Sequence, residues 1–232
     1  MRPFDEIREK YSRSHRIFGE SSKAMLTPKG RHEYRFQILL DVLDALTTPT
    51  LLDYGCGLGF LLTYLQSKSI DIQYTGMDIT PSFIDSCQKK FDTCGRFELI
   101  DPYQPIIGRF DIVFCSGVFN LAHTEDKSVS LSYVKARLGQ LLDATNKVLI
   151  CDFLSPFVDY VQPGAQHVEL EIVANWLISM GHRKFQIRHD LLPYEYSIVV
   201  YKNSTILRPN NVFESTEVQV ADAMRGAVPS SQ

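Results

Sequence analysis

Short apolar runs alternate along the chain with segments in which apolar residues recur every three or four positions. The second kind of segment predicts amphipathic helices, and the first predicts buried strands. The clearest helical patterns cover residues 31–46, 60–68, 131–142 and 168–180. The strand patterns cover residues 51–54, 72–77, 96–100, 110–115, 147–153, 185–189 and 196–201. This alternation predicts an α/β fold with a mostly parallel sheet that is covered by helices on both faces.

The last two strands are joined differently from the others. Only a short segment containing Pro193 separates residues 185–189 from residues 196–201. It is too short for a helical crossover, so the two strands should pair antiparallel. The sequence therefore predicts a Rossmann-like three-layer sandwich, with a seven-stranded, mostly parallel sheet and an antiparallel last strand.

The length and the position of these patterns suggest one main domain with two appendages. Residues 1–30 are polar and predict an N-terminal helical arm followed by a loop, and we expect the arm to cover the ligand site. Residues 31–202 hold the α/β pattern. Residues 203–232 are polar and are expected to form a flexible tail.

The most informative segment is the loop Gly55-Cys-Gly-Leu-Gly59, which follows the first strand and leads into a helix. Such a turn allows the backbone and a helix N-terminus to approach a ligand. A dinucleotide-binding GxGxxG fingerprint would need glycine where this chain has Phe60. Asp53, just before the loop, would repel a pyrophosphate but attract a cationic ligand. These features favour S-adenosylmethionine over a nicotinamide dinucleotide.

Two further acids follow the next two strands. Asp78 ends the second strand pattern, where a carboxylate can accept hydrogen bonds from both hydroxyls of a ribose. Asp101 follows the third, where an adenine amino group could donate to it, although a loop acid before Pro102 is an equally good interpretation. Together with Asp53, the acids predict a crevice at one edge of the sheet.

The glycine loop, Asp78, Asp101 and residues 110–116 together resemble the motifs of class I S-adenosylmethionine-dependent methyltransferases, over roughly residues 31–202. Residues 116–120 and 189–197 also resemble a bacterial subgroup of small methyltransferases that act on small molecules. The resemblance implies that Asp53 to Gly59 line the methionine end of the cofactor, Asp78 the ribose, Asp101 the adenine, and that Ser116 and Gly117 flank it. The full set of cofactor-binding residues predicted in this way is Asp53, Gly55, Cys56, Gly57, Gly59, Asp78, Ile79, Asp101, Ser116, Gly117, Tyr11 and Arg35. For Tyr11 and Arg35, plain packing or solvation is the favoured alternative.

The residues that would act on the methyl acceptor are less sharply defined. His123 and Asn120 follow the fourth strand and are the candidate catalytic residues, with His123 as a general base. Phe119, Asn120 and His32 are the candidate substrate-binding residues. Each histidine also fits a surface or capping role, and Asn120 fits a loop cap equally well. Gly117-Val-Phe-Asn120 departs from the Asp/Asn-Pro-Pro-aromatic motif that nucleic-acid amino methyltransferases often carry, which disfavours base methylation.

Charge and composition narrow the class of partner. The net charge of −3, without a dense basic run, disfavours a nucleic-acid partner. The five cysteines form no CxxC pair, no metal is expected, and no apolar run is long enough to span a bilayer, so we expect a cytoplasmic protein.

The predicted function is transfer of a methyl group to O or N of a small metabolite, such as a sugar or a secondary-metabolite intermediate. The alternatives are an inactive protein that binds the cofactor or its demethylated product, and, less favoured, a nucleic-acid or protein methyltransferase.

Overall fold

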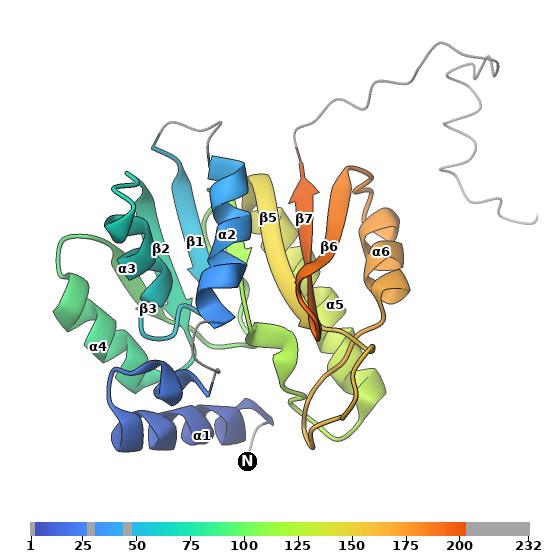
Figure 1. The fold of residues 1–232 in the computed structure, drawn as a ribbon, viewed down its shortest axis with the longest axis horizontal. Coiled ribbons are helices and arrows are strands. Elements are labelled where there is room, and N and C mark those ends of the chain that lie inside the picture. The colour runs from blue at the N-terminus through green and yellow to red at the C-terminus, as the bar shows by residue number, and fades with distance from the viewer. Residues whose placement is uncertain (1–2, 27–30, 44–47, 203–232) are drawn as a thin grey trace, which may run out of the picture.

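The apolar runs of the sequence become the strands of one sheet in the computed structural model, which describes residues 3–26, 31–43 and 48–202 (Figure 1). The strands are β1 Thr50–Tyr54, β2 Gln73–Asp78, β3 Arg96–Leu99, β4 Phe110–Cys115, β5 Thr145–Leu154, β6 Phe185–Leu192 and β7 Glu195–Tyr201. Their order is β3-β2-β1-β4-β5-β7-β6. The first five strands are parallel, and β7 is antiparallel to both β5 and β6. The predicted fold class and the antiparallel closing hairpin are confirmed.

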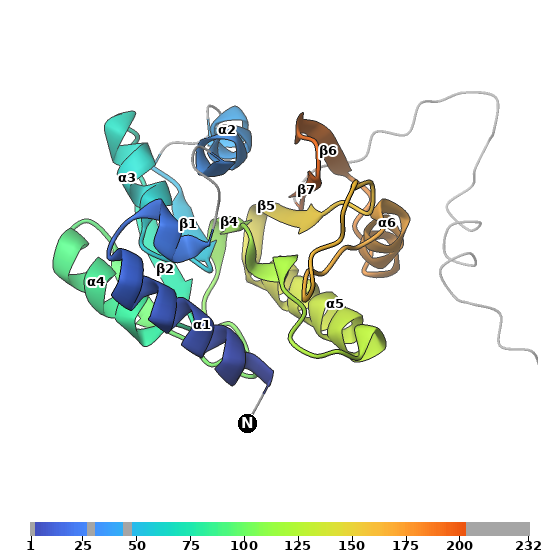
Figure 2. The same ribbon diagram turned by 60° about the horizontal axis from the view of Figure 1, so that its bottom comes forward.

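Helices cover both faces of this sheet, as Figure 2 shows from the lower edge. They are α1 Pro3–Phe18, η1 Ser22–Met25, α2 Arg31–Leu43, α3 Phe60–Ser67, α4 Pro81–Phe91, η2 Val118–Asn120, α5 Lys127–Ala144 and α6 Leu170–Ser179. The buried side chains of α2, α3 and α4 share one hydrophobic cluster with one face of the sheet. Those of α5 and α6 share a second cluster with the other face.

Successive side chains of the central strands point to opposite faces of the sheet and so pack in different clusters. Leu51 packs in the first cluster and Leu52 in the second, and both are fully buried. A parallel sheet that is covered on both faces needs apolar residues at nearly every strand position. This is why the central strands appear in the sequence as continuous apolar runs rather than as alternating patterns.

Some elements differ in length from the sequence patterns. Helix α5 begins at Lys127, four residues before the apolar pattern, because the Asp126 side chain caps it by accepting hydrogen bonds from the backbone of Ser128 and Val129. Such a cap is set by polar residues and leaves no apolar period. Residues 44–46 of the first predicted helix and the predicted tail 203–232 lie outside the described residues.

The lower edge of the sheet in Figure 1 holds the carboxyl ends of the parallel strands, and α1 crosses beneath them. The strand order reverses between β1 and β4, because the chain builds β2 and β3 on one side of β1 and β4 on the other. Ligands of open α/β sheets bind at such a reversal, outside the carboxyl ends of the strands. Within the described residues, no helix has both the length and the apolar character that a membrane crossing requires.

Candidate active site at the carboxyl edge of the sheet

A cavity lies at this strand reversal, between the glycine loop, the segment that follows β4 and the N-terminal arm. Its wall combines a few polar side chains with a larger number of aromatic and aliphatic ones. The lining residues are Phe4, Ile7, Tyr11, Met25, His32, Arg35, Phe36, Asp53, Tyr54, Gly55, Cys56, Phe60, Leu61, Asp78, Ile79, Thr80, Phe83, Ile100, Pro102, Phe114, Ser116, Gly117, Val118, Leu121 and Tyr133. A mostly apolar wall with a few convergent polar groups is typical of a small-molecule site.

The glycine loop is held against the end of β2 by its own backbone. The amides of Gly55 and Cys56 both donate to the carbonyl oxygen of Met77, at 2.7 and 3.0 Å. The loop then turns at Gly59, and α3 begins at Phe60 with its N-terminus at the cavity. The sequence therefore places a helix N-terminus where a bound ligand would meet it.

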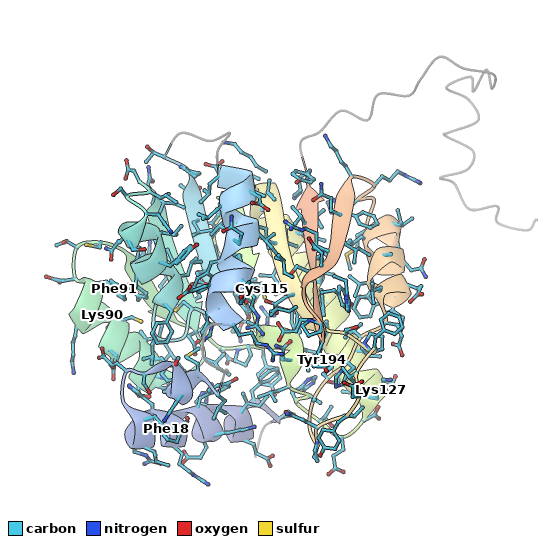
Figure 3. The ribbon with its side chains drawn as sticks, in the orientation of Figure 1. Phe18, Lys90, Phe91, Cys115, Lys127 and Tyr194 are labelled. Atoms are coloured by element: carbon cyan, nitrogen blue, oxygen red, sulfur yellow. The ribbon has the colours of Figure 1, made fainter. Side chains whose placement is uncertain are left out.

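Gly59 tests how tightly this turn is packed. Its φ is +70°, and a Cβ added to it would lie 2.5 Å from Cε2 of Phe91, which Figure 3 labels on α4 beside α3. We expect Gly59→Ala to lower the free energy of unfolding by about 2–5 kcal/mol, because left-handed strain and overpacking add together. Urea denaturation measures this change.

The matched control is Gly181→Ala, because Gly181 has φ +86° and open space where the new Cβ would lie. This variant should lose only the conformational part, about 1–2 kcal/mol. Equal losses in the two variants would show that Phe91 does not restrict the loop.

Asp53 is buried at the end of β1, with 4% of its surface exposed. The hydroxyl of Tyr74 donates to its Oδ2 at 2.5 Å, and the carboxyl also lines the cavity. Burial raises the pKa of Asp53 to about 7; the Tyr74 hydrogen bond opposes this shift, and nearby Asp78 adds to it. A carboxyl in this state is ready to be ionised by a cationic ligand.

Asp78 joins the glycine loop to the start of α4. Its Oδ2 accepts a hydrogen bond from the amide of Gly57 at 2.9 Å, and its Oδ1 accepts one from the amide of Thr80 at 2.8 Å. Burial raises the pKa of Asp78, and these backbone hydrogen bonds oppose the shift. The next residue, Ile79, lines the cavity, and its carbonyl oxygen accepts a hydrogen bond from Arg8 of α1.

The N-terminal arm forms one side of the cavity. Phe4, Ile7 and Tyr11 of α1 all line it. Burial, with Asp78 nearby, raises the pKa of Tyr11 to about 12, so its hydroxyl stays protonated at neutral pH. Met25 of η1 lies against Gly57, where an added Cβ would clash with the Met25 side chain. The arm and the glycine loop thus pack directly together.

The first turns of α2 bring two more predicted residues to the cavity. Arg35 is 6% exposed and forms ion pairs with Glu195, at 2.6 Å, and Asp152, at 3.6 Å. Burial, with Arg35 nearby, lowers the pKa of His32 to about 4, so its imidazole is neutral at neutral pH. The buried Nε2 of His32 has no hydrogen-bond partner among the described residues.

Six of the predicted site residues do not line the cavity. Phe119 is 2% exposed and stacks on Phe153 in the core, with ring centroids 5.6 Å apart. His123 lies behind Phe4, whose ring stacks on it at 4.9 Å, and its Nδ1 is 3.2 Å from the hydroxyl of Ser130. The other four are Gly57, Gly59, Asp101 and Asn120.

These four still lie next to lining residues. Asp101 accepts a hydrogen bond from the amide of Tyr103, while its neighbours Ile100 and Pro102 line the cavity. The buried Oδ1 of Asn120 has no hydrogen-bond partner among the described residues. Gly57 and Gly59 belong to the loop that Gly55 and Cys56 present to the cavity.

Sequence reasoning missed several functional candidates. The apolar wall residues Val118, Leu121 and Tyr133 gave no signal, because an apolar residue that lines a site and one in the core share the same pattern. Asp152 and Glu195, which hold Arg35, stand inside or beside apolar strand patterns as single buried acids. That irregularity was a usable signal, because a buried acid needs a partner.

Across residues 3–26, 31–43 and 48–202, no group of three or more metal-ligating side chains could hold a metal ion.

Comparison with known proteins agrees with this geometry. Residues 52–140 match a protein family described as a methyltransferase domain. A protein of Mycobacterium tuberculosis with a provisional methyltransferase name, Rv1506c, is 24% identical over 167 residues, which cover 70% of this chain and 99% of the relative.

Solved structures share the fold. The magnesium protoporphyrin IX methyltransferase of Synechocystis PCC 6803, solved with bound S-adenosylhomocysteine, superposes with a TM-score of 0.63 at 17% identity, over 87% of this chain and 100% of the other. An S-adenosylmethionine-dependent methyltransferase of Archaeoglobus fulgidus superposes with a TM-score of 0.55 at 16% identity, over 75% and 95% of the two chains.

Proposed function

We propose that this chain, which is a class I S-adenosylmethionine-dependent methyltransferase, moves the methyl group to an oxygen or nitrogen atom of a small molecule. The observation that carries this proposal is the cavity wall. Beyond the polar residues of the strand ends, the wall is mostly apolar and includes Phe4, Ile7, Leu121 and Tyr133. Phe4 and Ile7 belong to α1, which crosses beneath the strand ends (Figure 1). Such a covered apolar site suits a small acceptor. The cyanobacterial relative is named for a small molecule, magnesium protoporphyrin IX.

The cofactor would lie across the strand reversal. Asp53 would pair with the ammonium of its methionine part, and Asp78 would accept hydrogen bonds from the ribose hydroxyls. Arg35 would bind the methionine carboxylate, and Tyr11 would cover the site from α1. The adenine would lie beside Ile100 and Pro102, which brings its amino group near Asp101. The remaining contacts would come from Gly55, Cys56, Gly57, Gly59, Ile79, Ser116 and Gly117.

The chemistry needs mainly alignment. Bound S-adenosylmethionine would supply a methyl group on a positively charged sulfur; an acceptor lone pair would take this methyl group, S-adenosylhomocysteine would remain, and the acceptor's proton would pass to solvent water. Holding the two reactants in line lowers the barrier by roughly 7–11 kcal/mol in favourable models. The chain contributes a covered, mostly apolar site and fixed hydrogen-bonding groups.

Two residues would hold the acceptor. His32 lines the cavity with a neutral imidazole, so it would orient an acceptor hydroxyl or amine through a hydrogen bond. Asn120 would help from η2, where its amide nitrogen lies 3.9 Å from the position of a Cβ on Gly117. Phe119 would support this segment from the core. His123 stays a prediction as the general base, and its ring would have to separate from Phe4 to reach the cavity.

A labelled-methyl assay tests the proposal. The protein is incubated with S-adenosylmethionine that carries a labelled methyl group and with separate panels of phenols, sugars, amines, tRNA and denatured protein. We expect label in a member of the small-molecule panels, with an added mass of one methylene group, and none in tRNA or protein. Transfer to either macromolecule would contradict the proposed acceptor class. Binding of S-adenosylhomocysteine without any transfer would favour the inactive binding protein.

A further inference from the structure

We propose that Asp152 and Glu195 are positioning residues that turn one free edge of the Arg35 guanidinium toward the methionine carboxylate of the cofactor. This inference rests on the proposed function, because it assumes that the cofactor lies in the described cavity. The two acids come from β5 and β7; Glu195 lies inside the segment 189–197 that resembles the small-methyltransferase subgroup, and Asp152 lies outside the residues that carry the resemblance. Neither side chain lines the cavity, so both would act through Arg35.

Glu195 holds two of the three nitrogen atoms of the Arg35 guanidinium. Nε of Arg35 donates to Oε2 of Glu195 at 2.7 Å, and Nη2 lies 2.6 Å from the same oxygen. The other oxygen, Oε1, forms an ion pair with Nη1 of Arg31 at 3.1 Å. Arg31 and Arg35 are four residues apart and so share one side of α2. One buried carboxylate thus hydrogen-bonds Arg35 and lies at ion-pair distance from Arg31, although its Oε1 makes no hydrogen bond among the described residues.

Asp152 connects Arg35 to the segment after β4. Its Oδ1 accepts a hydrogen bond from the amide of Gly117 at 2.7 Å, and its Oδ2 accepts one from the hydroxyl of Ser116 at 2.5 Å. The same Oδ2 lies 3.6 Å from Nε of Arg35. Ser116 and Gly117 both line the cavity. A single buried side chain therefore sets the guanidinium and this part of the wall relative to each other.

The third nitrogen of the guanidinium, Nη1, takes part in none of these bonds. It lies over the backbone of Gly117, 3.3 Å from the position that a Cβ would occupy there. Gly117 has a φ of +74°, which glycine adopts without strain, and its missing side chain leaves room for the Arg35 guanidinium. Arg35 itself lines the cavity. The nitrogen that its partners leave open thus lies beside Gly117, and both Arg35 and Gly117 line the cavity.

The chemistry of the cluster suits a carboxylate ligand. A guanidinium presents its N–H groups in a planar fork that matches a carboxylate. Burying Arg35, Asp152 and Glu195, with Arg31 half-buried beside them, is costly, and a buried ion pair is often no more stable than an apolar replacement. Arg31, Arg35, Asp152 and Glu195 balance in formal charge, so the cluster can be retained without a ligand. A ligand carboxylate would bind the part of the Arg35 guanidinium that the two acids leave open.

The test compares two ligands that differ in the amino-acid part. S-adenosylhomocysteine carries the methionine-type carboxylate, and 5′-methylthioadenosine lacks it. Their dissociation constants are measured by calorimetry with the full chain and with Glu195→Gln, Asp152→Asn and the control Asp190→Asn. Asp190 is an exposed acid of the same hairpin that pairs with Arg188 instead. Circular dichroism and thermal melting check that each variant is folded.

We expect Glu195→Gln and Asp152→Asn each to weaken S-adenosylhomocysteine about tenfold, because a charge-assisted contact to its carboxylate is misaligned. Binding of 5′-methylthioadenosine should stay within about twofold, and Asp190→Asn should change neither constant. Equal weakening of both ligands would mean a merely structural role and would overturn the inference, as would wild-type binding of S-adenosylhomocysteine by both variants. Absence of binding by the unchanged chain would instead refute the proposed function.

Discussion

Replacing Asp78 with alanine is expected to weaken binding of S-adenosylhomocysteine by roughly 100-fold. Each carboxylate oxygen already accepts one backbone hydrogen bond, from Gly57 or Thr80, and a ribose hydroxyl would donate a further one to each. A hydrogen bond to a charged acceptor contributes about 1.5–3 kcal/mol, so the loss of two accounts for this factor. Calorimetric titration of the purified variant measures the change.

The same substitution should also destabilise the unliganded protein, because it leaves two backbone amides without their acceptor, each at a cost of about 1–3 kcal/mol. Asp78→Asn separates the two effects, since its amide oxygen can still accept one of these bonds. Asp85→Ala, at an exposed position of α4, is the matched control and should leave affinity unchanged. Undiminished binding by Asp78→Ala, in a folded protein, would remove the ribose contact from the proposed site.

The strand pattern allowed most of the fold to be predicted, for a physical reason. Parallel strands buried on both faces need continuous apolar runs, and the runs around Leu51 and Val113 stand out from their polar neighbours. Pro193 and the short segment around it left no room for a crossover helix, so the antiparallel hairpin followed. The place of β7 between β5 and β6 did not follow, because pairing order depends on how the whole sheet packs.

The position of the glycine loop and its acids at one edge of the sheet was predictable, because the loop and Asp78 directly follow strand patterns in the sequence and Asp53 lies near the end of one. Asp53 and Asp78 are placed by strands that end at the same edge of the sheet. The cluster around Arg35 was not predictable in the same way. Arg35 and Glu195 are 160 positions apart, and only the folded sheet brings them together. Likewise, the sequence around Phe119 could not indicate whether its ring enters the cavity or the core.

Binding of S-adenosylhomocysteine is expected to tighten about tenfold between pH 6 and pH 8. The pKa of Asp53 is raised to about 7 by burial, so its carboxyl is mostly protonated at pH 6 in the unliganded protein. The ammonium of the ligand favours the carboxylate, so binding below pH 7 must release a proton. Affinity therefore rises with pH, by at most tenfold per unit, and levels off above pH 7.

Two controls connect this dependence to Asp53. Asp53→Asn cannot ionise, so its affinity should be weaker at pH 8 and nearly flat from pH 6 to pH 7.5. 5′-Methylthioadenosine has no ammonium, so its binding to the unchanged chain should not follow the same curve.

The raised pKa also means that ionisation of Asp53 opposes folding as the pH increases through 7. Without ligand, Asp53→Asn should therefore lose less stability over this range than the unchanged chain. An S-adenosylhomocysteine affinity that is flat with pH in the unchanged chain would show that Asp53 does not meet the ammonium, whatever else binds in the cavity.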